Sequence, residues 1–470
     1  MRALWLTLLL CAAAAVAAEP GAKEVFEGFH PAFPGATGRL RVKQAIVERC
    51  IAQGQTVALL RNLKRMEPAL AAIQKRIDAD YAAYLDSGKK FFGWRANYER
   101  DFVRKHGSMP SEYPTPQGIQ KDFIKRELAL KKSLSVKRAE REFQRWVEER
   151  LAKLMEGGAP EGAVSALAAG LKGKDAVLQV RCAALLGRSR ETAAAAALDR
   201  AAGSLRDSGV LAAVLEARGA VGGDGALTAL GGALSHAAWP VRAGAVRGLQ
   251  RLGGDEAIGL LEKRLASERG RLLDDIRFAL SAEGAATDEG PVLFLGIRMH
   301  TEAVVYCVDG SDAEAWESVA RLTTESIQTL PDRARFGLVV YGREVTRFRK
   351  KLSDANGTNR AAAAEFLKRF EPAPPRFEGN ADLYAGLMAA FDLAGGGKGQ
   401  PPQADTICCM TLRGPSTGLF DQPIQLAQEI LARNRPLGIR VQAYGPSPAK
   451  HQHYLQRIAG QFGGSWVGSG

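Results

Sequence analysis

The sequence predicts a multidomain protein in which all-α segments precede an α/β domain with a doubly wound, mostly parallel sheet. Two changes of hydrophobic periodicity along the chain support this prediction. Long helical stripes come first, then short helices rich in Ala, Gly and Leu, and finally short apolar runs that alternate with helical patterns. With 470 residues, of which 46% are hydrophobic, the chain is long enough for several domains with their own cores.

The first segment, residues 1–18, has the pattern of a signal peptide. Arg2 supplies positive charge, residues 4–10 form a short apolar run, and residues 16–18 are small, as cleavage before Glu19 requires. No later window offers about 20 uninterrupted apolar residues for a membrane span. We therefore expect an exported protein, periplasmic or extracellular in the cell envelope, and membrane anchoring is the less favoured alternative.

Residues 23–155 are predicted to form a helical hairpin. Apolar residues recur at steps of three and four in one stripe over residues 42–85 and in a second over residues 136–154. Residues 106–116 contain three prolines and a glycine, which must break any helix. Two long antiparallel helices, with shorter pieces between them, are the simplest arrangement of this region.

The formal net charge of +13 is concentrated in this helical region. Residues 23–155 carry 27 Lys and Arg against 16 Asp and Glu, whereas residues 156–285 and 286–470 are almost neutral. Because Glu is interleaved with the basic residues, a solvated helix face explains the charge. Docking to an acidic protein, an anionic lipid or another acidic envelope component is the alternative. No nucleic-acid partner is expected, because the protein is predicted to be exported.

Residues 156–285 repeat with a period of about thirty. A Val-Arg pair at residues 180–181 recurs at 241–242, and similar apolar helices begin at Leu211 and Leu272. Each unit is predicted to be a pair of short helices that stacks on the next pair. The pattern resembles HEAT-like repeats of a short bacterial type, in about four degenerate copies; a non-repetitive helical bundle is the alternative.

Residues 290–470, which follow a linker at 284–291, alternate between strand and helix patterns. The expected strands are 303–308, 336–341, 406–410, 440–443 and 465–467. The expected helices are 313–330, 361–370, 383–393, 423–434 and 454–461. Such alternation predicts a parallel sheet with helices on both faces, and ligands of such sheets bind outside the carboxyl ends of the strands.

Several segments of this region carry a family resemblance. They are residues 294–298, residues 303–313 with the sequence AVVYCVDGSDA, and then 335–341, 379–387, 406–418 and 438–467. In this order, and over about 180 residues, they resemble a von Willebrand factor type A domain. The resemblance implies a Rossmann-like α/β fold that presents a surface to other proteins.

That family binds Mg²⁺ at an adhesion site made of an Asp-x-Ser-x-Ser loop, a Thr and a second Asp. Asp309 and Ser311 match the first two positions, but Ala313 stands at the third. The family's Thr falls on Ala381 and its second Asp on Arg413. Because three of these positions lack a side-chain oxygen that Mg²⁺ prefers, the resemblance implies a degenerate site, and we expect neither a metal nor another cofactor.

Arg413 introduces positive charge where the family's metal would bind. We hypothesise that its guanidinium pairs with Asp309 in place of the ion, since in this family the two strands that precede these residues are neighbours. Asp312 and Asp382 are the alternative, because their oxygens could restore a weak and altered metal site.

No catalytic site is recognised in the sequence. His451 and His453 are expected on a polar loop, and no Ser/His/Asp or Cys/His arrangement is present. The cysteines beyond residue 18 are expected to be buried structural thiols: Cys50, Cys182, Cys307, Cys408 and Cys409. We therefore expect a non-catalytic protein–protein interaction or scaffold protein; metal-dependent adhesion through a remodelled site is the alternative.

Overall fold

The structure is a computed structural model that forms two compact units. The helical unit contains residues up to Leu154 together with Pro160–Ala166, and the repeat–α/β unit contains Met155–Ala159 and Leu167–Gly470. The described residues are 22–26, 36–110, 117–281, 292–342, 344–372, 381–395, 400–412, 415, 418–420, 423–446, 453–461 and 463–469. The predicted signal peptide, the whole linker at 284–291, Arg413 and His451 lie outside them.

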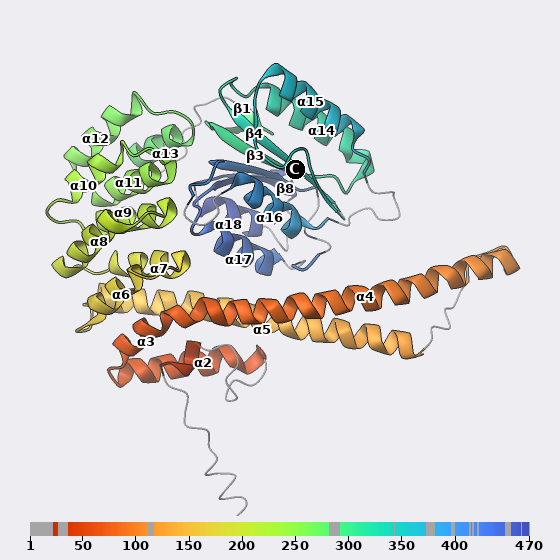
Figure 1. Cartoon of the computed structure of the whole chain (residues 1–470), viewed down its shortest axis with the longest axis horizontal. Coiled ribbons are helices and arrows are strands. Elements are labelled where there is room, and N and C mark those ends of the chain that lie inside the picture. The colour runs from red at the N-terminus through yellow and green to blue at the C-terminus, as the bar shows by residue number, and fades with distance from the viewer. Residues whose placement is uncertain are drawn as a thin grey trace, which may run out of the picture. The chain divides into compact units, whose positions relative to one another are not determined.

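Two long helices dominate the helical unit (Figure 1). After the short helices η1 (Glu24–Phe26), α2 (Ala36–Ala52), α3 (Thr56–Asn62) and η2 (Leu63–Arg65) come α4 (Met66–His106) and α5 (Gln117–Glu156). Ser133 donates a hydrogen bond to Asp80, Lys137 to Gln74, and Gln144 to the carbonyl of Met66. Because the α4 partner number falls as the α5 number rises, the two helices are antiparallel, as expected.

One detail of the hairpin prediction is wrong. Residues 42–85 do not form one helix, because Gly54 adopts a left-handed φ of 70° after α2 and a 3₁₀ turn at Leu63–Arg65 precedes α4. The shorter pieces therefore come before the two long helices instead of between them. The break at Gly107 occurs where it was predicted, with the glycine as a left-handed C-cap at φ 69°.

A buried ion pair joins α2 to α5. Lys43 Nζ lies 2.7 Å from Glu140 Oε2, and both side chains are almost fully buried. The Lys43 ammonium also lies 4.7 Å from the ring centroid of Phe143. On the surface of the same interface, the Arg150 guanidinium contacts the Glu48 carboxylate at 2.7 and 3.0 Å. Charge pairing thus sets the position of α2 on the hairpin, in addition to apolar packing.

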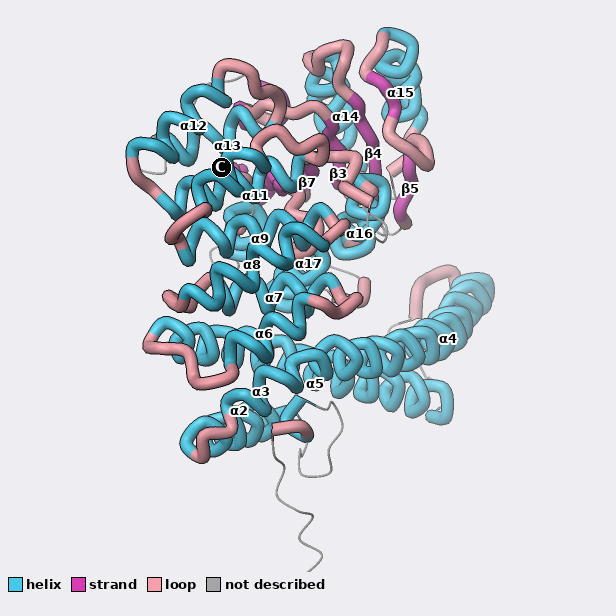
Figure 2. The backbone as a smooth tube through the Cα atoms, turned by 60° about the vertical axis from the view of Figure 1, so that its left-hand side comes forward, coloured by secondary structure: helices cyan, strands magenta, loops and turns pink. Residues whose placement is uncertain are grey.

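The predicted array of helix pairs is confirmed. The helices are α6 (Ala163–Leu171), α7 (Ala176–Leu186), α8 (Thr192–Ser204), α9 (Ser208–Val221), α10 (Ala226–Ala233), α11 (Trp239–Leu252), α12 (Asp255–Leu265) and α13 (Arg271–Leu280). The second helix of each pair begins 31 or 32 residues after the one before it. These second helices pack in succession, α7 on α9, α9 on α11 and α11 on α13, as the column of helices in Figure 2 shows.

Glycine permits the closest of these contacts, between α9 and α11. A Cβ atom on Gly244 would lie 2.4 Å from the carbonyl oxygen of Ala212, and one on Gly219 would lie 2.0 Å from that of Gly248. No side chain fits in these places without moving a backbone. The repeats are therefore rich in Ala and Gly because larger side chains would not fit between helices that lie this close together.

We expect Gly244→Ala to destabilise the protein by about 2 kcal/mol or more, because the methyl group would force two backbones apart. Gly259→Ala is the matched control: a Cβ added to Gly259, inside α12, would meet no atom within 4 Å, so alanine should stabilise the helix by up to about 1 kcal/mol. Urea unfolding followed by circular dichroism measures both. Equal midpoints for the two variants would contradict the close packing.

The α/β domain contains a seven-stranded sheet in the order β5-β4-β3-β7-β8-β9, with β6 also paired to β4. The strands are β3 (Ala303–Asp309), β4 (Arg335–Tyr341), β5 (Val345–Arg347), β6 (Ser353–Asp354), β7 (Thr406–Met410), β8 (Arg440–Pro446) and β9 (Trp466–Ser469). The pairs from β4 through β3, β7 and β8 to β9 are parallel, whereas β5 and β6 are antiparallel to β4. Without β6, the chain order of the strands is 3-2-1-4-5-6, the doubly wound order.

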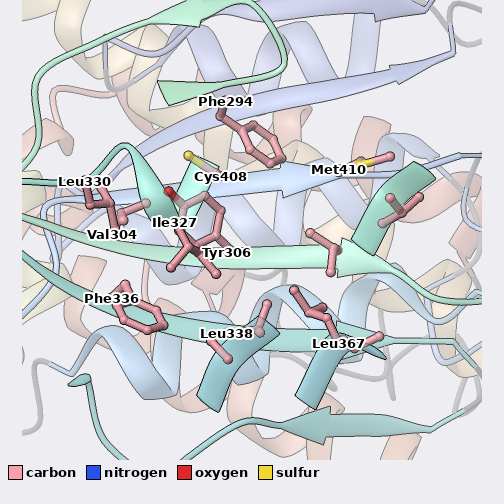
Figure 3. Close-up of a cluster of buried hydrophobic side chains, with 14 of the residues drawn as sticks. Phe294, Val304, Tyr306, Ile327, Leu330, Phe336, Leu338, Leu367, Cys408 and Met410 are labelled. Carbon is pink, nitrogen blue, oxygen red and sulfur yellow. The ribbon is translucent and has the colours of Figure 1, made fainter. Parts of the chain in front are cut away.

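Helices cover both faces of this sheet, as predicted (Figure 1). One face carries α14 (Ala313–Gln328) and α15 (Gly357–Arg369); the other carries α16 (Leu383–Ala394), α17 (Pro423–Asn434) and α18 (His453–Gly460). Figure 3 shows the buried cluster on the first face, where Tyr306 of β3 and Leu338 of β4 lie among side chains from the covering helices. All seven residues of β3 are buried, as expected of a central parallel strand.

The sequence did not predict the short strands. β1 (Val292–Phe294) and β2 (Ile297–Arg298) form a separate two-stranded sheet, and β5 and β6 are two or three residues long. Segments this short carry too few residues for an alternating pattern to be recognised. Among the described helices, none combines the length and the apolar character that crossing a bilayer requires.

Candidate functional site

The carboxyl ends of β3, β4 and β7 meet at one edge of the sheet, which we call the carboxyl edge. Asp309, the last residue of β3, lies in register with Tyr341 of β4, and Val308 lies in register with Met410 of β7. Strand order changes direction between β3 and β7, and such a point is where doubly wound sheets usually bind ligands. The edge is therefore the first place to look for a functional site.

Backbone amides hold the Asp309 carboxylate at this edge. The amide of Ser311 donates to Oδ1 at 2.9 Å, and the amide of Leu412, just after β7, donates to Oδ2 at 3.0 Å. The side chain is fully buried. Burial raises the pKa of Asp309 above its ordinary value, against the opposing effects of the nearby Ser311 hydroxyl and of these two backbone hydrogen bonds. A raised pKa means that this group's contribution to stability falls as the pH rises from the ordinary towards the raised value.

The side chains at the other positions that the resemblance matched to the family's metal site do not complete a ring of oxygen donors around Asp309. Ser311 is buried, and no hydrogen-bond partner for its Oγ is found among the described residues. Ala313 is exposed at the start of α14, Ala381 is buried before α16, and Arg413 lies outside the described residues. One hydroxyl and one hydrogen-bonded carboxylate do not supply the near-octahedral oxygen shell of Mg²⁺, so the described residues do not fit that ion.

Asp312 and Asp382 cap helices. Asp312 accepts hydrogen bonds from the amides of Glu314 and Ala315 at the start of α14. Asp382 accepts one from the amide of Ala385 at the start of α16. Burial raises the pKa of Asp382, and Gly418 approaches its carboxylate so closely that a Cβ there would lie 2.2 Å from Cγ. Helix capping accounts for the position of both carboxylates.

Two contributors to this edge were not predicted from the sequence. Tyr341, fully buried at the end of β4, donates a hydrogen bond to the carbonyl of Met410 at 2.9 Å and thereby ties β4 to β7 beneath Asp309. Burial raises the pKa of Tyr341 well above its ordinary value. The amide of Leu412 was missed because backbone donors carry no sequence signal. The neighbouring strands that the resemblance implied are present, since β3 and β7 are paired.

The five cysteines expected to be structural are buried and free. Burial raises the pKa of Cys182 to about 12, and it also raises the pKa of Cys307 and of Cys408. Thiols with raised pKa values are poor nucleophiles at neutral pH. Among the described residues, no group of three His, Cys, Asp or Glu side chains is arranged to hold a metal ion.

We expect Asp309→Asn to destabilise the protein by about 1–3 kcal/mol, because an NH₂ group would replace one of the two oxygens and face a backbone N–H donor. The loss of unfolding free energy should be the same with and without Mg²⁺. A Mg²⁺ concentration of about 5 mM is high enough to occupy even a weak site. Denaturant unfolding under both conditions measures the loss. The structural role would be contradicted if the variant were as stable as the wild type without Mg²⁺ and if Mg²⁺ stabilised only the wild type.

At the opposite, amino edge of the sheet, the repeats pack on the α/β domain within the repeat–α/β unit. Arg440, the first residue of β8, is 2% exposed, and its Nη1 lies 2.7 Å from Asp274 Oδ2 of α13. The same guanidinium donates to Thr406 Oγ1 and to the carbonyl of His300. Asp274 also accepts from the amide of His300 at 2.8 Å. We call this contact, together with that of Arg271 described next, the arginine seam.

Arg271 forms the second half of the arginine seam. It is almost fully buried at the start of α13, with Nε 3.2 Å from Asp275 Oδ2, and Nη1 donates to the carbonyls of Asp405 and Gly438 in the α/β domain. Its guanidinium lies 5.1 Å from the ring centroid of Trp239. Burial lowers the pKa of Arg271, and the Asp275 carboxylate opposes that shift. The sequence carried no signal for this contact, because its partners are separated by up to 167 residues.

We expect Arg440→Ala to destabilise the repeat–α/β unit by about 3 kcal/mol, because Asp274 would lose its buried partner. Arg321→Ala is the matched control: that residue forms an exposed pair with Glu325 on α14, 60% and 54% exposed, and should cost about 0.5 kcal/mol or less. Thermal unfolding of both variants measures the difference. Equal losses would mean that the arginine seam contributes nothing beyond a surface pair.

The charged surface of the helical unit is largely paired along each helix. Ion pairs four residues apart include Lys90 with Asp86, Arg95 with Glu99 and Lys131 with Glu127. Exposed large hydrophobic side chains gather over the second half of α4, the following loop and the first half of α5: Leu85, Phe92, Val103, Met109, Ile124 and Leu128. The surface therefore combines paired charges with exposed apolar groups.

Comparisons with known proteins add little to this geometry. No family model and no curated protein matches the chain. Among solved structures, a von Willebrand factor type A protein from Catenulispora acidiphila is similar at 20% identity and a TM-score of 0.28, over 37% of this chain and 40% of that one. Proximal thread matrix protein 1 from the mussel byssus is similar at 17% identity and a TM-score of 0.26, over 36% and 43%. The chain thus spans less than half the length of either structure.

By fold, the chain belongs to the class of proteins that join helical repeats to a doubly wound α/β domain. The function we assign to it rests on the contacts at the carboxyl edge and at the amino edge of the sheet.

Proposed function

We propose that the protein is a non-catalytic protein–protein interaction or scaffold protein of the periplasm or cell envelope, whose α/β domain works without a metal ion. One observation carries the proposal: the arginine seam joins two modules that commonly present surfaces to other proteins into one compact unit. A partner that contacts both modules therefore meets a preorganised surface, and less conformational entropy is lost on binding.

The state of Asp309 supports the same proposal. Both carboxylate oxygens accept backbone hydrogen bonds, so the side chain acts as an internal connection between β3 and the segment after β7. The repeats contact the amino edge, where β7 and β8 begin. Within this unit they therefore pack away from the carboxyl edge. That edge is suited to serve as a docking surface shaped by loops and helix ends.

The helical unit supports an additional docking role for residues 23–155. Because its basic residues are often paired with acidic ones, attraction to an acidic or anionic envelope component would come from the excess of Lys and Arg over the whole segment. The exposed apolar side chains around Phe92 and Leu128 would add a contribution that salt does not screen.

Affinity capture from envelope extract, with the full mature chain as bait, tests the proposal. An unrelated bait of similar net charge is the control. Each capture is repeated at about 0.1 and 1 M salt, between which the screening length of charges falls about threefold. We expect specific proteins that remain bound at high salt, which would favour the surfaces of the repeats and of the α/β domain over the basic helical unit. Capture of nothing beyond what the control bait retains would contradict the proposal.

Metal-dependent adhesion through a remodelled site is the second candidate, because the buried Ser311 Oγ lacks a hydrogen-bond partner among the described residues. Calorimetric titration with Mg²⁺ and Ca²⁺ separates the two functions. The leading proposal predicts no saturable heat. Saturable heat that disappears in Asp309→Asn would favour adhesion through the metal.

A further inference from the structure

A cavity of about 400 Å³ lies beside the arginine seam, between the repeats and the amino edge of the sheet. Five arginines line it: Arg242 of α11, Arg269 in the loop before α13, Arg271 of α13, Arg333 in the loop before β4, and Arg335 of β4. We call this cavity the arginine pocket. Its acidic lining residues are Glu302 and Asp405, so the lining carries more positive than negative side chains.

The buried acidic residue of the arginine pocket is hydrogen-bonded within the α/β domain. Asp405 Oδ1 accepts hydrogen bonds from the hydroxyls of Thr301 and Thr406 at 2.6 and 2.7 Å, and Oδ2 accepts from the amide of Glu302 at 3.0 Å. Asp405 therefore serves to hold the start of β3 next to the start of β7. Among the described residues, Asp405 forms no ion pair with Arg242, Arg269, Arg333 or Arg335.

The four lining arginines outside the arginine seam, which we call the rim arginines, have fewer carboxylate partners than those of the seam: Arg242, Arg269, Arg333 and Arg335. Arg269 and Arg333 are exposed, and among the described residues neither guanidinium has an ion pair or hydrogen bond. Arg335 is exposed and donates to the carbonyl of Gln403 at 3.2 Å. Arg242 donates to the carbonyls of His236 and Ala237 and lies 3.5 Å from Glu268. Guanidinium groups thus stand together on three segments with few carboxylate partners.

Two helix N-termini strengthen the positive potential of the arginine pocket. Trp239 and Arg271 begin α11 and α13, and neither helix has a side chain that caps its first amides. The partial positive charge of a helix N-terminus therefore adds to the charge of the guanidinium groups. Apolar surface is also present, because Trp239, Leu272 and Pro402 line the same cavity, and the Trp239 indole N–H donates to the carbonyl of Pro402 at 3.1 Å.

We propose that the arginine pocket binds an acidic peptide segment, whose carboxylates pair with the rim arginines while an apolar side chain contacts Trp239. A peptide fits better than a small free anion because the unpaired guanidinium groups are exposed on separate segments, and a chain with several spaced carboxylates reaches all of them. This inference deepens the proposed interaction function and rests on it.

The test is a fluorescence anisotropy titration of the full mature chain with a labelled hexapeptide of alternating Glu and Leu. We expect saturable binding that weakens at least about tenfold in the double variant Arg269→Glu, Arg333→Glu, since reversed charges repel the carboxylates. Both substitutions remove exposed side chains without partners among the described residues, so the fold should persist.

The matched control is Lys350→Glu with Lys351→Glu, which makes the same change of net charge on the exposed segment between β5 and β6. It should alter the affinity about twofold or less, because screened charges outside the pocket contribute little. Inorganic phosphate should not compete at millimolar concentration.

Three outcomes would overturn the pocket assignment: no saturable binding to the wild type, equal weakening in both double variants, or competition by phosphate as strong as by unlabelled peptide. After any of these outcomes the proposed interaction function would still stand if both double variants, used as bait, captured specific proteins from envelope extract. Capture of no specific protein, despite peptide binding, would instead contradict the proposed function.

Discussion

The burial of Arg440 and Arg271 is the constraint on which the repeat–α/β unit depends. A guanidinium group removed from water is strongly destabilising unless carboxylates and carbonyls replace its hydration. Here the carboxylates Asp274 and Asp275 belong to α13, whereas the carbonyls of Asp405 and Gly438 belong to the α/β domain. Neither module supplies the complete set of partners alone. The last repeat and the amino edge of the sheet must therefore come together for either arginine to be buried, and the two modules behave as one compact unit.

The two edges of the sheet consequently have different tasks. At the amino edge, polar groups just before or at the starts of β3, β7 and β8 bind the last repeat. At the carboxyl edge, Asp309 and Tyr341 connect the three central strands from within, leaving Ser311 Oγ as the buried polar atom without a partner among the described residues there. Asp309, which the sequence resemblance matched to a metal site, thus stabilises the sheet, and its buried carboxylate accepts hydrogen bonds from two backbone amides.

Charge is also organised at two different levels. In the helical unit, basic residues alternate with acidic ones along single helices, so that neighbours four apart pair and the surface stays hydrated. In the arginine pocket, guanidinium groups far apart in sequence converge, although residues 156–470 are almost neutral by count. A local excess of charge in a cleft raises the local concentration of oppositely charged ligands more than the same charge spread over a surface.

Periodicity in the sequence determined the class of each region, because helices with one apolar stripe, paired short helices and buried parallel strands each have a distinct spacing of apolar residues. It placed the strand Thr406–Met410 and the helix Pro423–Asn434 at their observed bounds. The family resemblance, and not periodicity, placed Asp309 at the end of a strand. Periodicity did not reveal that Gly54 would divide the first helix, or which groups would hold the Asp309 carboxylate, because backbone amides leave no trace in the residue pattern. The arginine seam and the arginine pocket were decided only by tertiary structure, since charges separated by more than 100 residues become neighbours only when the chain is folded.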